Sequence, residues 1–261
     1  MIDFRNVSLR FDEHQVLKDM SFTVAPGETL VILGPSGCGK TTILRLLLGL
    51  IHPESGSIVI DGRDIVGLRE REMGQVRRTM ALVFQGAALF DSLTVRENVG
   101  YRLWEEGLQT DEFIDQRVDE SLRFVGLHDV SEHMPAELSG GMKKRVAIAR
   151  ALASTPRVIL YDEPTAGLDP INTHIINELI CRMHTKEAVT QVVVTHDIET
   201  AYRVANHLIM LHRGEKIFDG TVEELKASDD LHVRAFLSPG GVLSTPRCFP
   251  TKDGGYQVID D

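Results

Sequence analysis

The sequence predicts an α/β fold with a mostly parallel core sheet, and two observations carry that prediction. Short apolar runs at 29–33, 80–84, 157–164 and 190–196 alternate with helical patterns, as in chains whose strands are joined by crossover helices. These runs are almost wholly apolar, which is typical of strands that helices cover on both faces. After the first run come a glycine-rich loop and an apolar helix that continues to residue 50.

Further elements flank this core. The segments 2–11 and 15–24 alternate apolar and polar residues, which predicts two antiparallel strands at the start of the chain. Residues 56–62 have the composition of another strand, and residues 86–153 are mostly helical and predict a helical subdomain. The other expected elements are helices at 95–104, 113–125, 142–153, 170–184 and 197–205, a hairpin at 207–220, and short helices at 222–228 and 232–237.

The chain is expected to form one domain over residues 1–238, followed by a short C-terminal tail over residues 239–261. The tail is rich in Gly, Pro and Asp. The sequence leaves open whether this tail is flexible or packs on a neighbouring subunit.

Composition and charge narrow the classes of function. The 261 residues carry a formal charge of −10, so the chain lacks the basic field of a protein that binds nucleic-acid phosphates, and we expect no nucleic-acid partner. Three widely spaced cysteines offer no disulfide framework, which favours a reducing compartment. The longest apolar run, 43–51, is broken by Arg45 and is too short to span a bilayer, so we expect no membrane crossing by this chain itself.

The glycine-rich loop has the spacing of a phosphate-binding loop. Gly34, Gly39, Lys40 and Thr41 match the pattern G-x-x-x-x-G-K-[ST] between a strand and a helix. Glycines let consecutive N–H groups point at an anion, and the helix N-terminus adds its positive end. Lys40 supplies a cation for the outer phosphates and Thr41 a hydroxyl for Mg²⁺. The residues expected around the phosphates are Gly34, Pro35, Ser36, Gly37, Cys38, Gly39, Lys40, Thr41 and Thr42. The thiol of Cys38 is either reactive or small and inert, and we favour the inert interpretation.

Two carboxylates end the third buried strand. Asp162 closes the apolar run at the carboxyl edge of the sheet, where ligands gather in open α/β folds. There it is placed to hold Mg²⁺, directly or through water. Because successive strand side chains diverge, Glu163 cannot share that role, and it is suited to polarise the attacking water as general base. The competing interpretation is a pair of solvated acids at a strand end.

A second candidate anion site begins at Ser139. Ser139, Gly140 and Gly141 precede a strongly helical run and offer a hydroxyl and bare N–H groups at a helix start. A plain helix cap would also explain them. Because one pocket has no need of two phosphate loops, we expect two copies of the chain to meet head to tail. Each copy then closes its serine-glycine helix over the nucleotide that the other holds.

This constellation resembles the nucleotide-binding subunit of ABC transporters over nearly the whole chain. In the terms of that family, 34–41 is the Walker A loop, 158–163 the Walker B strand and 138–142 the signature. Two departures are Met142, where Gln is common, and Ala166-Gly167, where many members have Ser-Ala; neither removes a catalytic group. Four further positions take their roles from the resemblance: Phe11 as the aromatic that stacks on adenine, Gln85 in the Q-loop that senses Mg²⁺ and the permease, Asp169 in the D-loop, and His196 as the switch histidine that contacts the γ-phosphate.

The resemblance implies a P-loop NTPase of the ABC cassette type, with a mostly parallel core sheet, an antiparallel β subdomain and a helical subdomain. It implies hydrolysis of ATP with Mg²⁺. The implied catalytic residues are Glu163, His196, Lys40 and Gln85, and the implied metal ligands are Thr41, Gln85 and Asp162. The implied partners are a second copy of the chain and a transmembrane permease, at the cytoplasmic face of the inner (plasma) membrane.

Several segments are similar to one branch of the family, the ATPases of lipid transporters of the Mla type (maintenance of lipid asymmetry) and their Mce-associated relatives. These segments are FQGAALFDSLTVRENV, LSGGMKKRVAIARAL, EPTAGLDPI and VRAFL. The branch implies transport of phospholipid or other lipid between membranes, with an Mce-domain lipid-binding protein in the complex. Two alternatives stay open: another ABC transporter, for amino acids or lipoproteins, or a soluble ABC ATPase of the iron–sulfur assembly type.

Overall fold

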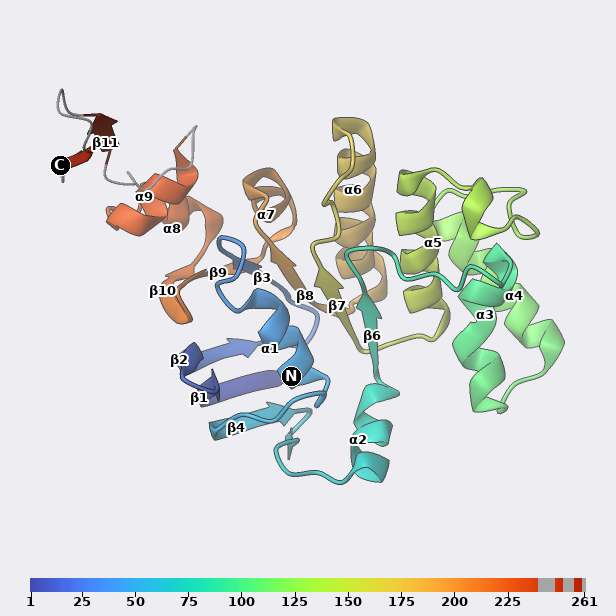
Figure 1. The fold of residues 1–261 in the computed structure, drawn as a ribbon. Coiled ribbons are helices and arrows are strands. Elements are labelled where there is room, and N and C mark those ends of the chain that lie inside the picture. Colours follow the sequence, from blue (N-terminus) through green and yellow to red (C-terminus); the bar gives the residue numbers. More distant parts are fainter. Residues whose placement is uncertain (239–246, 251–255, 260–261) are drawn as a thin grey trace.

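The core of the molecule is a six-stranded sheet (Figure 1). The computed structural model describes residues 1–238, 247–250 and 256–259. The strand order is β10–β9–β3–β8–β7–β6, and every neighbouring pair is parallel except β10 and β9. The strands are β3 (Thr29–Leu33), β6 (Met80–Val83), β7 (Val158–Asp162), β8 (Thr190–Thr195), β9 (His207–His212) and β10 (Glu215–Gly220). The predicted α/β class with a mostly parallel sheet is confirmed.

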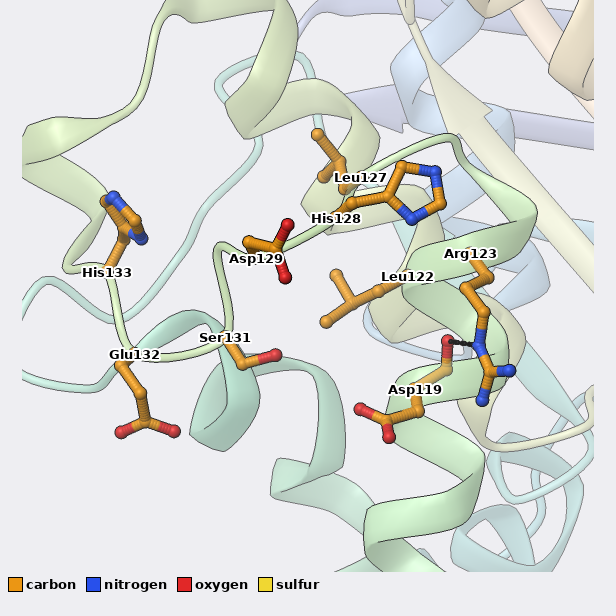
Figure 2. A pocket seen from close by; sticks show the side chains of 9 residues that line it. All are labelled: Asp119, Leu122, Arg123, Leu127, His128, Asp129, Ser131, Glu132 and His133. Carbon is orange, nitrogen blue, oxygen red and sulfur yellow. Dashed lines mark hydrogen bonds between the residues drawn. The ribbon is translucent and has the colours of Figure 1, made fainter.

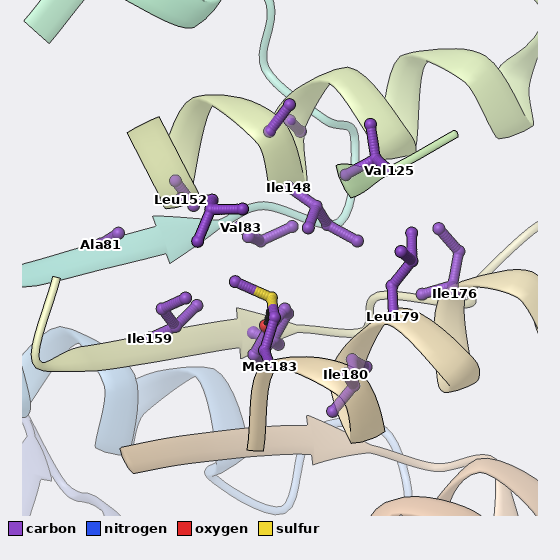
Figure 3. Close-up of a cluster of buried hydrophobic side chains, with 14 of the residues drawn as sticks. Ala81, Val83, Val125, Ile148, Leu152, Ile159, Ile176, Leu179, Ile180 and Met183 are labelled. Carbon is purple, nitrogen blue, oxygen red and sulfur yellow. Dashed lines mark hydrogen bonds between the residues drawn. The ribbon is translucent and has the colours of Figure 1, made fainter. Parts of the chain in front are cut away.

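Both faces of this sheet are buried under other elements, which explains why its strands are almost wholly apolar. Leu30 and Ile32 of β3 belong to one buried cluster, together with side chains of α1 (Lys40–Leu47). Val31 and Leu33 point the other way, into a second cluster. Figure 3 shows part of that second cluster, which gathers side chains from β6, β7 and the helices that cover them. These helices are α5 (Gly140–Ala153) and α6 (Pro170–Glu187), and α7 (Ile198–Val204) adds Ala201 and Val204 to the same cluster.

A smaller antiparallel sheet lies beside α1 (Figure 1). Its strand order is β2–β1–β4–β5, so the predicted antiparallel pairing of the first two strands is confirmed. Its strands are β1 (Ile2–Phe11), β2 (His14–Val24), β4 (Ser55–Ile60) and β5 (Arg63–Asp64). The inward side chains of β1, among them Phe4 and Val7, are buried in the same cluster as α1. This sheet therefore supports the helix that follows the phosphate loop.

Three helices make up most of the segment between β6 and β7. They are α3 (Val95–Glu106), α4 (Asp111–Phe124) and α5, and they pack on one another beyond α6 (Figure 1). Each begins at a hydroxyl side chain, Thr94, Thr110 or Ser139, that accepts a backbone N–H of the first turn. Such caps satisfy donors that a helix start leaves free. Capping explains why these helices begin where they do.

The structure also holds elements that the sequence patterns did not predict. α2 (Glu70–Arg77) buries only Met73, and its short, mostly polar sequence contains Gly74, a poor helix former in a helix interior. The short η1 (Pro135–Glu137) precedes the serine-glycine segment. After β10 come α8 (Val222–Ala227) and α9 (Leu231–Leu237), close to the predicted bounds.

The C-terminal tail is described only in part. Within it, β11 (Arg247–Pro250) and β12 (Tyr256–Ile259) pair antiparallel. The rest of residues 239–261 lies outside the described residues, and the division of the chain at residue 238 stays a prediction.

Candidate active site

The phosphate-binding loop joins β3 to α1, and two glycines are essential to its path. Gly39 has a φ of 108°, and a Cβ there would lie 2.9 Å from a side-chain carbon of Leu17. At Gly34 a Cβ would lie 2.5 Å from the carbonyl oxygen of Leu211. A larger residue at either place would displace the loop. With Gly39 as its N-cap, α1 begins at Lys40 and presents the N–H groups of its first turn to the loop.

Lys40 lies in a shielded ion pair at the centre of the site. Its ammonium donates to the carbonyl oxygens of Gly34 (2.8 Å) and Pro35 (3.1 Å). It also lies 3.3 Å from Oε1 of Glu163, and the two side chains are only 6% and 12% exposed. A phosphate bound in the loop would compete with Glu163 for this ammonium, because both are anions that accept charge-assisted hydrogen bonds.

Thr41 and Asp162 form a second contact between the loop and the sheet. Asp162 is the last residue of β7, and its Oδ1 accepts a hydrogen bond of 3.0 Å from the Thr41 hydroxyl. Burial raises the pKa of Asp162, and the hydrogen bond from Thr41 opposes that shift. The two residues offer hard oxygen donors, and Mg²⁺ takes few protein ligands beside water and phosphate. They therefore fit Mg²⁺, although the described residues hold no cluster of three or more His, Cys, Asp or Glu side chains.

Glu163 and His196 meet across the carboxyl edge of the sheet. Oε2 of Glu163 accepts the backbone N–H of His196 at 3.2 Å and lies 2.9 Å from its Nδ1. His196 directly follows β8, and its ring is about half exposed. Glu163 has a φ of 47°, so the chain turns out of the strand direction at this residue. The turn brings Glu163 to Lys40 while Asp162 reaches Thr41, so both carboxylates serve neighbouring positions of one site.

These contacts surround a pocket of about 270 Å³ that is lined by half of the predicted site residues. The predicted residues that line it are Ser36, Gly37, Gly39, Lys40, Thr41, Thr42, Gln85, Glu163 and His196. Val16 of β2 also lines it, and the sequence held no sign of that, since Val16 reads only as an apolar strand position. Gln85 reaches the pocket because it lies two residues after the end of β6, beside β7 in the sheet.

Cys38, Phe11 and Asp169 lie outside the lining of that pocket. The Cys38 side chain is 4% exposed and burial raises the pKa of its thiol, which agrees with an inert loop side chain. Phe11 is 48% exposed at the end of β1. Asp169 is the N-cap of α6 and accepts the backbone N–H of Asn172 at 3.0 Å. Hydrogen bonds from Asn172 lower the pKa of Asp169.

The serine-glycine segment also lies outside the pocket of its own chain. Ser139 and Gly140 are exposed, and the Ser139 hydroxyl accepts the backbone N–H of Met142 at 3.3 Å. Gly141 is buried against Asn172, whose amide oxygen would lie 2.2 Å from a Cβ at this position. The segment therefore presents an exposed helix start that lines no part of this pocket in its own chain.

Two further pockets lie on or beside the segment between β6 and β7. One, of about 390 Å³, lies between α4 and the loop that follows it, and none of the predicted site residues line it (Figure 2). The other is a groove of about 910 Å³ at the border between the core sheet and the helices, and Phe84, Phe90 and Tyr101 line it. These three aromatic side chains are 39–44% exposed.

A family model described as "ABC transporter" matches residues 17–166, more than half of the chain. The chain belongs to the ABC transporter family. As a member of that family it binds ATP and is an ATP-hydrolysing transport subunit, so the resemblance carried by the loop, carboxylate and serine-glycine motifs is confirmed. Within the described residues, no helix has both the length and the apolar character that crossing a bilayer requires.

Relatives of this ABC ATPase are similar along most of their length. Protein TRIGALACTOSYLDIACYLGLYCEROL 3, chloroplastic, of Arabidopsis thaliana is 41% identical over 94% of this chain and 75% of that protein. The "intermembrane phospholipid transport system ATP-binding protein MlaF" of Escherichia coli is 37% identical over 99% of this chain and 95% of that protein. Among solved structures, the ATP-binding cassette MJ0796 was determined as a dimer in a post-hydrolysis state bound to ADP and Pi. It is 35% identical to this chain, with a TM-score of 0.78 over 85% of this chain and 99% of that one.

Proposed function

We propose that this ABC ATPase drives the movement of phospholipid or another lipid between membranes. The observation that carries the proposal is the similarity to MlaF, which extends over 99% of this chain and includes its C-terminal end. MlaF is described as part of an intermembrane phospholipid transport system. Cassettes such as MJ0796 are also similar over most of this chain, at 85%. The similarity to MlaF goes further, because coverage of 99% extends into residues 239–261, and this extension favours a shared transport system.

The catalytic roles follow from the contacts in the pocket. When ATP occupies the loop, its phosphates take over the ammonium of Lys40 and release Glu163 from the ion pair. Glu163, still held by the backbone N–H of His196, then polarises the attacking water as general base. Lys40 and His196 stabilise the charge that builds on the transferred phosphoryl group. Thr41, Asp162 and Gln85 would hold Mg²⁺, which when bound would neutralise part of the phosphate charge.

The complete site consists of two copies of the chain. Ser139 and Gly140 are exposed and make no part of their own chain's pocket, so they are available to a nucleotide held by a second copy. The dimeric structure of MJ0796, which is similar over 85% of this chain, supports the same arrangement here. Closure is favoured because a nucleotide that contacts both copies binds the closed dimer more tightly than the open one.

The permease is expected to dock in the groove at the border between sheet and helices. Phe84, Phe90 and Tyr101 offer exposed aromatic surface there, next to Gln85 of the nucleotide pocket. A helix of a membrane-spanning permease that filled this groove would place this ABC ATPase at the cytoplasmic face of the inner membrane. The same transporter would include an Mce-domain lipid-binding protein.

The proposal is tested by reconstituting the ATPase with its permease in proteoliposomes. Donor vesicles carry a fluorescent phospholipid that is self-quenched, and unlabelled acceptor vesicles receive it. We expect dequenching that requires ATP and Mg²⁺ and that stops in the Glu163→Gln variant. The vesicles assayed without the permease serve as the control for spontaneous exchange.

Two outcomes would contradict lipid transport. An ATPase that phospholipid does not affect, but that an amino acid or a lipoprotein stimulates, indicates a different ABC transporter. Purification of the tagged chain without any membrane protein, together with the visible absorption of an iron–sulfur cluster on its partners, indicates the soluble assembly-type ATPase. Both alternatives leave the ATP chemistry unchanged.

A further inference from the structure

Lys144 is a buried lysine of α5 to which the mechanism above gives no role. Its side chain is 6% exposed, five residues after the Ser139 cap of the helix. Its ammonium donates to the carbonyl oxygen of Gln85 and lies 3.3 Å from the carbonyl oxygen of Glu163. The lysine therefore joins three segments: the serine-glycine helix, the segment after β6 and the end of β7.

This arrangement has a cost that an apolar residue would avoid. Removing an ammonium from water is unfavourable unless its donors are satisfied. Burial lowers the pKa of Lys144, and the nearby carboxylates Asp162 and Glu163 oppose that shift. Both hydrogen-bond acceptors are backbone carbonyls, so the contact fixes the position of the main chain and involves neither side chain. The side chains of Gln85 and Glu163 line the nucleotide pocket instead.

α5 holds the segment after Gln85 at a second point. Arg150, nearly two turns further along the helix, donates to the carbonyl oxygens of Ala87 (2.9 Å) and Ala88 (2.8 Å). Both alanines have left-handed backbone conformations, with φ of 63° and 49°, which non-glycine residues adopt only when held by their surroundings. The segment 85–88 is thus bound to α5 by both Lys144 and Arg150. Of these two residues, only Lys144 also contacts the main chain of Glu163.

We propose that Lys144 is a positioning residue for ATP hydrolysis, which ties the serine-glycine helix to the main chain of Gln85 and Glu163. When α5 moves on closure over the nucleotide of the second copy, the contact carries Gln85 and Glu163 to their working positions. The inference rests on the roles proposed above for these two residues. Because Lys144 touches neither the phosphate loop nor Lys40, its loss affects turnover and leaves ATP binding intact.

The test compares three substitutions in the full-length protein with its permease. Lys144→Met keeps the length of the side chain and removes its donors, Lys144→Gln removes the charge and shortens the side chain, and Lys144→Arg keeps charge and donors. Lys143→Met removes the same charge from the same helix and is the matched control. For each variant, kcat is measured for ATP turnover, and ATP affinity is measured at equilibrium with Mg²⁺ chelated.

We expect kcat of Lys144→Met to fall about tenfold or more, since hydrogen bonds to charged groups are of that strength. ATP affinity should change less than about twofold, because the substitution removes an interaction that matters only during turnover. Lys144→Arg should recover most of kcat, and Lys143→Met should resemble the wild type. Unchanged kcat in Lys144→Met overturns the proposal. A second pattern would also overturn it: Lys144→Met loses kcat and ATP affinity to the same extent, and Lys144→Arg restores neither. That pattern indicates a structural role only.

Two further comparisons keep the test decisive. If Lys144→Met does not fold, the test compares Lys144→Arg with Lys144→Gln. A lower kcat in Lys144→Gln at equal ATP affinity supports the positioning role, and equal kcat in the two variants overturns it. Glu163→Gln separates this inference from the proposed function. Wild-type turnover in Glu163→Gln refutes the general base itself, whereas normal turnover in Lys144→Met beside an inactive Glu163→Gln refutes only the role of Lys144.

Discussion

Replacing Glu163 by Gln should have opposite effects on ATP binding and ATP turnover. In the nucleotide-free protein the carboxylate pairs with Lys40 at 3.3 Å, and the two side chains are 6% and 12% exposed. The pair is therefore little screened by solvent. In the proposed mechanism, ATP takes Lys40 from this carboxylate when it binds, so the native ion pair opposes ATP binding, while the same carboxylate is the proposed general base for hydrolysis.

The size of the effect follows from these contacts. A hydrogen bond to a charged group contributes about 1.5–3 kcal/mol. Because Lys40 keeps its bonds to the carbonyl oxygens of Gly34 and Pro35, the lower value applies. The free energy of unfolding of the nucleotide-free variant should fall by about 1.5 kcal/mol. The ATP-bound form does not contain the pair, so ATP affinity should rise about tenfold. Loss of the general base should lower kcat by about 10²–10⁴-fold.

Three measurements on Glu163→Gln and the wild type check these values: urea unfolding without nucleotide, ATP binding at equilibrium, and ATP turnover. The variant should also accumulate as an ATP-loaded dimer, visible by sedimentation. Glu215→Gln is the control, because it breaks a Lys–Glu pair of 2.7 Å whose side chains are 66% and 53% exposed. Exposed pairs contribute little, so this control should bind ATP normally. Equal stability and equal ATP affinity in Glu163→Gln would refute the competition, and wild-type turnover would refute the base.

Three shorter predictions concern other residues of the site. Ser139→Arg should bind nucleotide almost normally and lose turnover, because an arginine at the exposed helix start blocks the second copy; a fully active variant contradicts the two-copy site. Phe11→Ala should weaken ATP binding by about 1 kcal/mol, as expected for the loss of an aromatic contact, whereas Phe11→Tyr should bind ATP as the wild type does. Competition binding measures both affinities, and unchanged affinity in Phe11→Ala contradicts the stacking role. Burial raises the pKa of the Cys38 thiol, so its thiolate fraction at pH 8 is lower than that of a free cysteine. Burial raises the pKa of the Cys181 thiol as well, but Cys181 is only half-buried whereas Cys38 is buried. Maleimide should therefore label Cys38 more slowly than Cys181, as mass spectrometry of timed samples would show.

Much of this architecture was predictable because its determinants are local. The strands β3, β7 and β8 are buried on both faces, so their composition alone distinguishes them from amphipathic elements. Parallel strands end at the same edge, so an acidic residue closing β7 had to lie near the loop that follows β3. The contact of 3.0 Å between Thr41 and Asp162 follows from that geometry.

The features that escaped prediction depend on distant parts of the chain. Lys144 stands in the run Lys143-Lys144-Arg145, which has the appearance of a solvated helix face. Only the fold brings it to Gln85, 59 residues earlier, and to Glu163, 19 residues later. α2 is short and mostly polar and contains Gly74, a poor helix former, so its sequence gives only a weak helix signal. The contacts of Lys144 are tertiary contacts, which a local pattern cannot encode.

The backbone at Glu163 shows why two adjacent carboxylates can divide two tasks. In a continuing strand, Glu163 would point to the opposite face from Asp162 and away from the pocket. Its φ of 47° instead turns the chain, at a cost that the surrounding contacts must offset. The N–H of Glu163 donates to the carbonyl oxygen of Val194 at 2.9 Å, its own carbonyl accepts Lys144, and its carboxylate accepts His196. Every polar group of the residue is thus engaged. Hydrogen bonds with Val194 of β8 and with Lys144 of α5 stabilise the unusual backbone conformation. The direction of the proposed general base therefore depends on the position of the serine-glycine helix as well as on the sheet from which it projects.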